Sequence, residues 1–470
     1  MNLLQRAGKN IFWLFMSEVC ARGFAFIAIL YLARILGTSG FGLYSLGLAM
    51  GAILWGIADA GVTGYGLREV AKDRDRAGEL LNSLNSMRIV IAILTFLFLS
   101  ITLFSLNMPP EKKSVLLLGG LYILAYSISP DWVFQGLEQM QYLVVGKVAN
   151  SLSFLVTIFL FVKAPSNVYI AILFFSVFHL IGGIILLSIL YKRFKICFTP
   201  TFSITQWWNH FRESFFFFLG GSVTNLGNYI PIFLLSIFSS NAQLGIFSAS
   251  HRLIMIVFAM GNIVTLGIYP MLSNLYSNDI KAFRSLHTTY QNLVIFVGLP
   301  LATVGMLAGN DIVSLLFGHS YERSGDIMMI LVWLVPFSLL RLNYGRTLLS
   351  ANFHRFNTIA LGSGAFVTFV LCVFLIPRYE GMGAAWALIG GEVITLLLMK
   401  WMASLKLNTA KLINIYTVKI LIASFIVGIV LLRLHFHVVI NITLGIVFYG
   451  ILTFILGIIS REKIMKALRG

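Results

Sequence analysis

The stretch from Val90 to Leu106, VIAILTFLFLSITLFSL, carries no charged side chain. Two further uncharged runs lie at residues 167–191 and 439–459. A helix that crosses a membrane needs about 20 mostly apolar residues. The whole chain shares this character, because it is 59% hydrophobic and 11% charged with a mean hydropathy of +0.91, whereas soluble domains are about 25% charged. The sequence therefore predicts an all-α polytopic membrane protein.

Polar, glycine-containing and proline-containing loops divide the chain into about fourteen segments of membrane-span length, about 20 residues each. The predicted spans are 10–36, 41–64, 84–106, 114–135, 142–163, 167–191, 213–237, 243–269, 287–309, 323–344, 357–376, 382–403, 414–433 and 439–459. An even number of spans places both termini on one side of the membrane.

The distribution of lysine and arginine predicts which side that is. If the N-terminus is cytoplasmic, most of the 34 basic residues fall in cytoplasmic segments. The external loops and helix ends then hold only Lys112, Lys113, Lys163, Arg323, Arg378 and Arg433. Because cytoplasmic loops are enriched in these residues, we expect N-in, C-in topology in the cytoplasmic membrane. The same rule accounts for the net charge of +17, so we expect no nucleic-acid partner.

The chain contains an internal repeat at an offset of 203 residues. Phe41-Gly42-Leu43-Tyr44-Ser45 corresponds to Leu244-Gly245-Ile246-Phe247-Ser248. Three polar positions match at the same offset, and a proline pair matches with a few inserted residues: Arg22 with Asn225, Asp59 with Asn262, Arg88 with Gln291, and Pro130 with Pro336. Six spans separate the copies, so the two repeats run in parallel, an arrangement that places binding sites between halves.

This repeat predicts two lobes of six helices followed by two more helices. The N-lobe covers residues 1–195 and the C-lobe residues 213–403. The segment 196–212 carries Trp207 and Trp208. Because tryptophan favours the membrane–water boundary, we expect this segment to be an interfacial linker. Helices 13 and 14 and a basic tail occupy residues 404–470.

Two arginines lie too deep in predicted spans for their charges to reach water easily. Arg22 is near the middle of the first span, and Arg252 is in the outer half of the eighth. Charges at this depth are costly and usually face a cavity or a partner. Because guanidinium stays charged and matches phosphate geometry, one arginine per lobe predicts binding of an anionic substrate.

Neutral polar side chains in the same spans are candidates for hydrogen bonds to a hydroxyl-rich substrate. These are Asn225, Asn228 and Gln291, with Asn262 as a further candidate. Their alternative role is to hydrogen-bond across helices in the bundle, and both roles stay open.

Seven further charged residues in the spans are candidates for coupling or gating. They are Glu18, Asp59, Arg88, Asp131, Lys147, Arg341 and Glu392. Several alternatives stay open. Arg88 and Arg341 lie close enough to span ends to extend their charges to the surface. Asp59, Arg88, Asp131 and Lys147 can instead form a salt-bridge ring that closes the cytosolic side. Glu18, one turn from Arg22, can simply neutralise it.

No cofactor is expected. The three cysteines are far apart and have no metal-binding spacing. No phosphate-binding loop of the type G-x-x-x-x-G-K-[ST] occurs. Transport therefore needs another driving force, and a coupling ion, H⁺ or Na⁺, is the candidate.

Five motifs in the first half of the chain resemble the polysaccharide flippases of the Wzx type. These belong to the superfamily that also holds the MATE multidrug exporters and the lipid II flippases. The motifs are Tyr31–Gly37 (YLARILG), Phe41–Ser45 (FGLYS), Asp59–Gly61 (DAG), Leu67–Ala71 (LREVA) and Pro130–Met140 (PDWVFQGLEQM).

The resemblance implies a carrier that moves a polyprenyl-diphosphate-linked oligosaccharide, such as an O-antigen or exopolysaccharide repeat unit, across the cytoplasmic membrane by alternating access. The lipid II flippases are similar in placing arginines of helices 1 and 8 in a cationic cavity, and Arg22 and Arg252 occupy those helices. It also implies that helices 13 and 14 hold the lipid tail. Membrane lipids are expected partners, as are glycan polymerases or glycosyltransferases.

Two other functions compete with this one. A MATE-like exporter of cationic compounds would use carboxylates such as Glu18, Asp59, Asp131 and Glu392, although basic neighbours offset most of them. A membrane enzyme that polymerises glycans would need a sizeable external loop. The longest expected here is residues 310–322, so we expect no enzyme.

Overall fold

The computed structural model of the chain describes residues 3–409, 414–433 and 438–458. Every regular element within these residues is a helix. The chain divides into two compact units, residues 1–248 and 249–470, which are described one at a time. The predicted lobe boundary at residues 196–212 stays a prediction.

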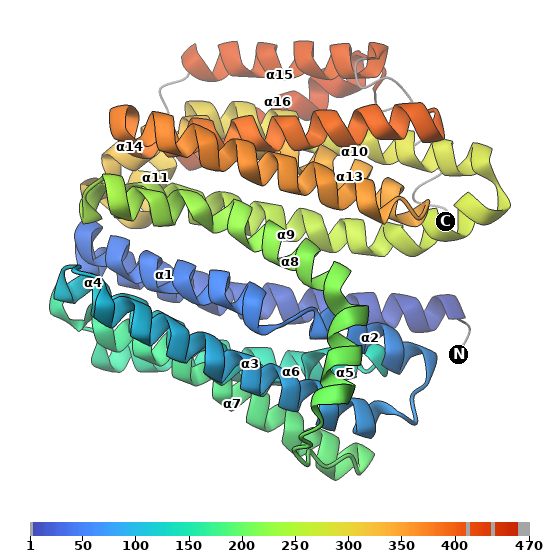
Figure 1. Cartoon of the computed structure of the whole chain (residues 1–470). Helices are drawn as coiled ribbons and strands as arrows, with labels where there is room; N and C mark the ends of the chain where they lie inside the picture. The colour runs from blue at the N-terminus through green and yellow to red at the C-terminus, as the bar shows by residue number, and fades with distance from the viewer. Residues whose placement is uncertain (1–2, 410–413, 434–437, 459–470) are drawn as a thin grey trace. The chain divides into compact units, whose positions relative to one another are not determined.

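Unit 1 is built from long helices that pack side by side. Its elements are α1 (Leu3–Ala58), α2 (Val62–Lys72), α3 (Ala77–Ser105), α4 (Pro110–Ser127), α5 (Asp131–Gly136), α6 (Met140–Phe161), the short turn η1 (Pro165–Asn167), α7 (Val168–Phe194), α8 (Ile204–Phe238) and the start of α9 (Asn241–Asn278). Helix α1 packs against α6, α4 and α8, while α7 packs against α4 and α6 (Figure 1).

Unit 2 holds the rest of the chain. Its elements are the remainder of α9, α10 (Ile280–Leu307), α11 (Gly309–Phe317), the turn η2 (His319–Tyr321), α12 (Glu322–Leu331), α13 (Leu334–Ser350), α14 (His354–Leu407), α15 (Ile415–Arg433) and α16 (Val438–Ile455). Helix α10 contacts α13 and α15, and α13 lies against α14.

Within the described residues, nine helices are long and apolar enough to cross a membrane, or ten if the bent pair α12 and α13 forms one span. The chain is therefore a multi-pass membrane protein. The count is lower than fourteen partly because α1 and α14 each contain two of the predicted spans. A single non-helical residue separates the two parts, Gly37 in α1 with φ 64° and Glu380 in α14 with φ 49°.

Several predicted span boundaries were wrong. The second span ends at Ala58 rather than at residue 64, because Ala60 and Gly61 adopt positive φ. The span predicted at 114–135 is broken before Pro130, and the one at 323–344 is broken before Pro336 with a bend of 41°. Proline lacks the backbone N–H that would continue each helix.

The predicted interfacial linker and the longest predicted external loop are partly helical. Helix α8 begins at Ile204, so the second half of the linker at 196–212 is continuous with the following span. The segment 310–322 contains most of α11. Trp207 and Phe211 of the first segment pack on a hydrophobic core, and Val313 and Phe317 of the second are buried.

The two copies of the repeated motif touch each other inside unit 1. A Cβ atom on Gly42 would overlap the backbone oxygen of Asn241, and a Cβ atom on Gly245 would overlap that of Thr38. Small residues allow two helix backbones to approach this closely in a membrane. The glycine of each motif is therefore required by the other copy.

Replacing Gly42 by alanine is expected to lower the free energy of unfolding by about 1–3 kcal/mol, as overpacking does in well-packed interiors. The obstacle is a backbone atom, which cannot rotate away. Gly23 on the same helix is the matched control, because no neighbouring atom of the described residues lies within 4 Å of the position that a Cβ atom would take there. Gly23→Ala should leave stability unchanged or raise it by up to about 1 kcal/mol. Equal effects of both substitutions, measured by unfolding in mixed detergent micelles, would contradict the close approach.

Candidate functional site

The two deep arginines lie in different units. Arg22 is exposed on α1 of unit 1, and Arg252 is partly buried on α9 of unit 2, beside the buried His251. The side chain of Glu18 lies outside the part of the chain that the structure describes. The predicted role of both arginines in binding an anion stays a prediction.

The candidate asparagines Asn225 and Asn228 are partly buried on α8. A hydrogen bond joins α8 to α1: Ser222 Oγ donates to the carbonyl of Gly56 at 2.8 Å. Asn225 lies beside the same glycine, with its Nδ2 atom 3.3 Å from the position that a Cβ atom would take there. Both asparagines are thus held on a helix that packs against the second half of α1.

Arg88 on α3 is completely enclosed, with 1% of its surface exposed. Its Nε donates to the carbonyl of Ser127 at 2.9 Å, and its Nη2 donates to the carbonyl of Ser129 and to Asn85 Oδ1. Its Nη1 lies 3.5 Å from Asp59 Oδ1. This burial excludes the alternative in which Arg88 extends its charge to the surface.

The hydrogen bonds of Arg88 explain how the break after α4 is tolerated. Helix α4 stops at Ser127 ahead of Pro130, so its last carbonyls have no helical partner. Asn85 Nδ2 donates to the carbonyl of Ile128 at 3.1 Å, between the two carbonyls that Arg88 serves. Since lipid offers no hydrogen bonds, Arg88 and Asn85 together supply the donors that the break requires.

The other two residues of the predicted salt-bridge ring lie in different surroundings. Asp131 accepts from neutral groups, the hydroxyls of Tyr126 at 3.0 Å and Ser129 at 2.6 Å. Among the described residues it has no ion-pair partner. Lys147 is partly buried on α6. Within this set the structure therefore brings together one ion pair, Asp59 with Arg88.

Unit 2 contains a second buried ion pair between two predicted residues. Arg341 Nε on α13 donates to Glu392 Oε1 on α14 at 2.5 Å, and both side chains are largely buried. The guanidinium also lies 5.5 Å from the ring centre of Phe258, a geometry that adds cation–π attraction. The two candidates Arg341 and Glu392 therefore form one ion pair and are not two separate sites.

The repeat positions of unit 2 are filled by neutral contacts. Gln291, the counterpart of Arg88, is fully buried and accepts from the Tyr344 hydroxyl at 2.8 Å, which agrees with its alternative role in joining helices. Asn262, the counterpart of Asp59, accepts from Arg346 at 3.2 Å. Arg346 was not a candidate from the sequence because it follows the end of the span predicted at 323–344, although it lies within the last turns of α13.

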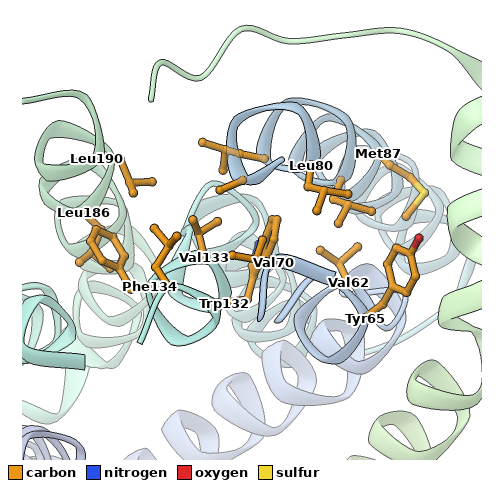
Figure 2. Close-up of a cluster of buried hydrophobic side chains, with 14 of the residues drawn as sticks. Val62, Tyr65, Val70, Leu80, Met87, Trp132, Val133, Phe134, Leu186 and Leu190 are labelled. Atoms are coloured by element: carbon orange, nitrogen blue, oxygen red, sulfur yellow. The ribbon is translucent and has the colours of Figure 1, made fainter. Parts of the chain in front are cut away.

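The motif PDWVFQGLEQM forms part of a packed core at one end of unit 1. Trp132 on α5 is 1% exposed, and a Cβ atom added to Gly66 of α2 would lie 2.5 Å from its ring. Gly136 faces Val70 in the same way, at 2.7 Å. Figure 2 shows these side chains together with Phe134. Two motifs that carry the resemblance, LREVA and PDWVFQGLEQM, therefore pack against each other.

Ion pairs surround this core on the exposed side. Arg74 Nη2 lies 2.7 Å from Glu138 Oε2, and Glu69 accepts from both Arg68 and Lys72. Burial opposes the charged form of Glu69, but the hydrogen bonds from Lys72 and Arg68 outweigh it and lower the pKa of its carboxyl. No group of three or more metal-binding side chains occurs among the described residues.

Long apolar helices with ion pairs enclosed between them define the class of the chain, a polytopic membrane protein. Residues 7–276 match the family described as polysaccharide biosynthesis protein, and the chain belongs to this family.

Known proteins resemble the chain over most of its length. The putative O-antigen transporter of Escherichia coli (strain K12) is 25% identical over 378 residues, which cover 78% of this chain and 90% of that protein. The solved structure of the lipid II flippase MurJ in its inward closed conformation has a TM-score of 0.74 at 15% identity, with 95% of this chain and 98% of that one covered. An inward-facing MATE family multidrug transporter of the MOP superfamily has a TM-score of 0.65 at 13% identity, with coverage of 83% and 95%. The two structural likenesses concern the fold.

Proposed function

We propose that the chain is a flippase that moves a polyprenyl-diphosphate-linked oligosaccharide across the cytoplasmic membrane and is not an enzyme. Membership of the polysaccharide biosynthesis family carries this proposal. The relative named as a putative O-antigen transporter, and the fold shared with a lipid II flippase, support it.

The physical task of such a carrier is to remove the cost of taking a polar head group through lipid. Each buried polar group without a partner costs about 2–7 kcal/mol in an apolar medium. Arg22 and Arg252 would offer cationic partners to the diphosphate, and Asn225 and Asn228 would offer hydrogen bonds to sugar hydroxyls. The proposed cycle is alternating access driven by H⁺ or Na⁺, with both termini cytoplasmic.

The proposal is tested by replacing Arg22 and Arg252, separately, with alanine in a strain whose own gene is deleted. Loss of either diphosphate partner is expected to reduce surface polysaccharide at least about tenfold, since one charged hydrogen bond contributes about 1.5–3 kcal/mol. Surface polysaccharide is measured on whole cells, and membrane levels of each variant are measured by immunoblot. Lys163→Ala, at an exposed position between α6 and η1, serves as the control. Wild-type polysaccharide in both arginine variants would remove them from the site, and wild-type polysaccharide in the deletion strain would contradict the function.

The second candidate function is export of small cationic compounds, which the fold shared with a MATE family transporter favours. Such cargo would require carboxylates that are free to bind it. Asp59 and Glu392 are instead paired with Arg88 and Arg341, which leaves less negative charge available. Accumulation of a fluorescent cationic dye in the deletion strain, reversed by the restored gene, would favour this candidate over the first.

A further inference from the structure

A row of aromatic side chains runs across three helices of unit 1. We call it the aromatic wall, and it consists of Trp55 on α1, Tyr122 and Tyr126 on α4, and Phe175 and His179 on α7. Tyr126 meets Trp55 edge-on with ring centres 4.5 Å apart. Tyr122 stacks on Tyr126 at 5.5 Å, and Phe175 stacks on Tyr122 at 5.6 Å.

The charged residues described above hold one end of the aromatic wall in place. The Arg88 guanidinium lies 5.3 Å from the ring centre of Trp55. Asp131 accepts a hydrogen bond from the Tyr126 hydroxyl at 3.0 Å. Because both partners are themselves fixed by hydrogen bonds, the rings are held rigidly before any ligand arrives, which favours binding.

Three polar atoms of the aromatic wall have no partner in the described part of the chain. They are the indole Nε1–H of Trp55, the hydroxyl of Tyr122 and Nε2 of His179. Nδ1 of His179 donates to the carbonyl of Phe175 at 2.7 Å, so Nε2 is left as an acceptor. All five side chains are only partly buried, and none of these three atoms is among the enclosed atoms without a hydrogen bond.

Aromatic rings together with polar atoms that lack partners favour a sugar over an acyl chain as the ligand. Enclosed polar atoms in a packed core almost always have partners, and an acyl chain would leave all three atoms of the aromatic wall unpaired at a cost. A sugar ring has a C–H face that packs flat on an aromatic ring, and its hydroxyls both donate and accept hydrogen bonds. Aromatic rings that carry a polar atom offer contact area and hydrogen bonds together.

We propose that the aromatic wall is a binding subsite for the sugar rings of the lipid-linked glycan, separate from the groups that bind the diphosphate. The proposal rests on the function proposed above and adds a sugar-binding subsite to the diphosphate-binding groups. Tyr122 is the central ring of the aromatic wall, held between Tyr126 and Phe175, and contributes its hydroxyl. Trp55 contributes a donor and His179 an acceptor.

Two probes test the proposal on the full chain purified in detergent. The first is the lipid-linked oligosaccharide extracted from the deletion strain, and the second is polyprenyl diphosphate without sugar. Their affinities are compared by native mass spectrometry. The wild-type chain is expected to bind the first probe about tenfold more tightly, the factor that corresponds to about 1.4 kcal/mol.

The variants then assign this difference to the aromatic wall. Tyr122→Leu is expected to lose the tenfold preference while its affinity for polyprenyl diphosphate is unchanged, and Tyr122→Phe is expected to lose about threefold, because it keeps the ring and removes one neutral hydrogen bond. Phe174→Leu is the matched control, since Phe174 neighbours Phe175 but its ring lies against Phe161 at 5.7 Å. Phe174→Leu should bind both probes as the wild type does.

The possible failures are distinguishable. If Tyr122→Leu weakens both probes equally, or neither, while its melting temperature matches that of Phe174→Leu, the subsite assignment is overturned and the flippase proposal stands. If Tyr122→Leu melts early, Trp55→Phe provides the same comparison with a ring retained. If the deletion strain accumulates no lipid-linked oligosaccharide, or the wild-type chain binds neither probe, the proposed function itself fails.

Discussion

Arg88→Met is expected to lower the free energy of unfolding by about 3–5 kcal/mol, the cost of breaking a buried ion pair by removing one partner. Methionine keeps much of the side-chain volume but donates no hydrogen bond. The carbonyls of Ser127 and Ser129 lose their donors, and Asp59 loses its cationic partner. Unfolding in mixed detergent micelles measures the change.

Arg76 provides the control for this prediction. It pairs with Glu79 at 3.4 Å, but both side chains are about half exposed or more. Exposed ion pairs contribute about 0–1 kcal/mol, so Arg76→Met should change stability little. The double variant Arg88→Met, Asp59→Asn should lose less than the sum of the single variants, because the neutral amide no longer needs a counter-charge. A loss below about 1 kcal/mol for Arg88→Met would show that water or another donor satisfies the end of α4.

The sequence predicted the location of most helices because apolar length is a strong signal. The run 90–106 lies almost wholly within α3, and the last predicted spans coincide with α15 and α16. Prediction from the sequence failed at the helix breaks. Apolar residues continue on both sides of Pro336, and the few polar residues around Pro130 lie within an otherwise apolar segment, so composition does not mark where the backbone breaks.

Charge pairing was only partly predictable for a related reason. Asp59 and Arg88 were predicted as charged residues within spans, with a salt bridge as one alternative, and the structure pairs them. The partners of Arg341 and Arg346 depend on which helix faces come together, and single-chain patterns do not contain that information. The span predicted at 323–344 ended two residues before Arg346, which lies within α13 and donates to Asn262.

The aromatic wall has a local pattern in the sequence. Tyr122 and Tyr126 are four residues apart, as are Phe175 and His179, so each pair shares a helix face. Aromatic residues are common in membrane helices, and this spacing alone does not distinguish a binding surface from packing. The distinction came from the atoms that the packed helices leave without partners.

Trp132→Ala is expected to lower the free energy of unfolding by about 3–5 kcal/mol, as for other buried aromatic side chains. The indole ring fills the space left open by Gly66, and its Nε1–H donates to Asn85 Oδ1 at 3.1 Å. Trp132→Phe should lose less, because it keeps most of the ring and removes the hydrogen bond. Both are measured by unfolding in mixed detergent micelles.

Trp401 on α14 is the control, because it is 59% exposed. Trp401→Ala in micelles should change stability by no more than about 0.5 kcal/mol. Equal losses for Trp132 and Trp401 would contradict the packing described for α2 and α5. The motif PDWVFQGLEQM is more specific than any other feature of the chain, yet its tryptophan contacts glycine and asparagine in a closed core. If the prediction holds, this motif identifies the fold, and selection of cargo depends on side chains elsewhere, such as the aromatic wall.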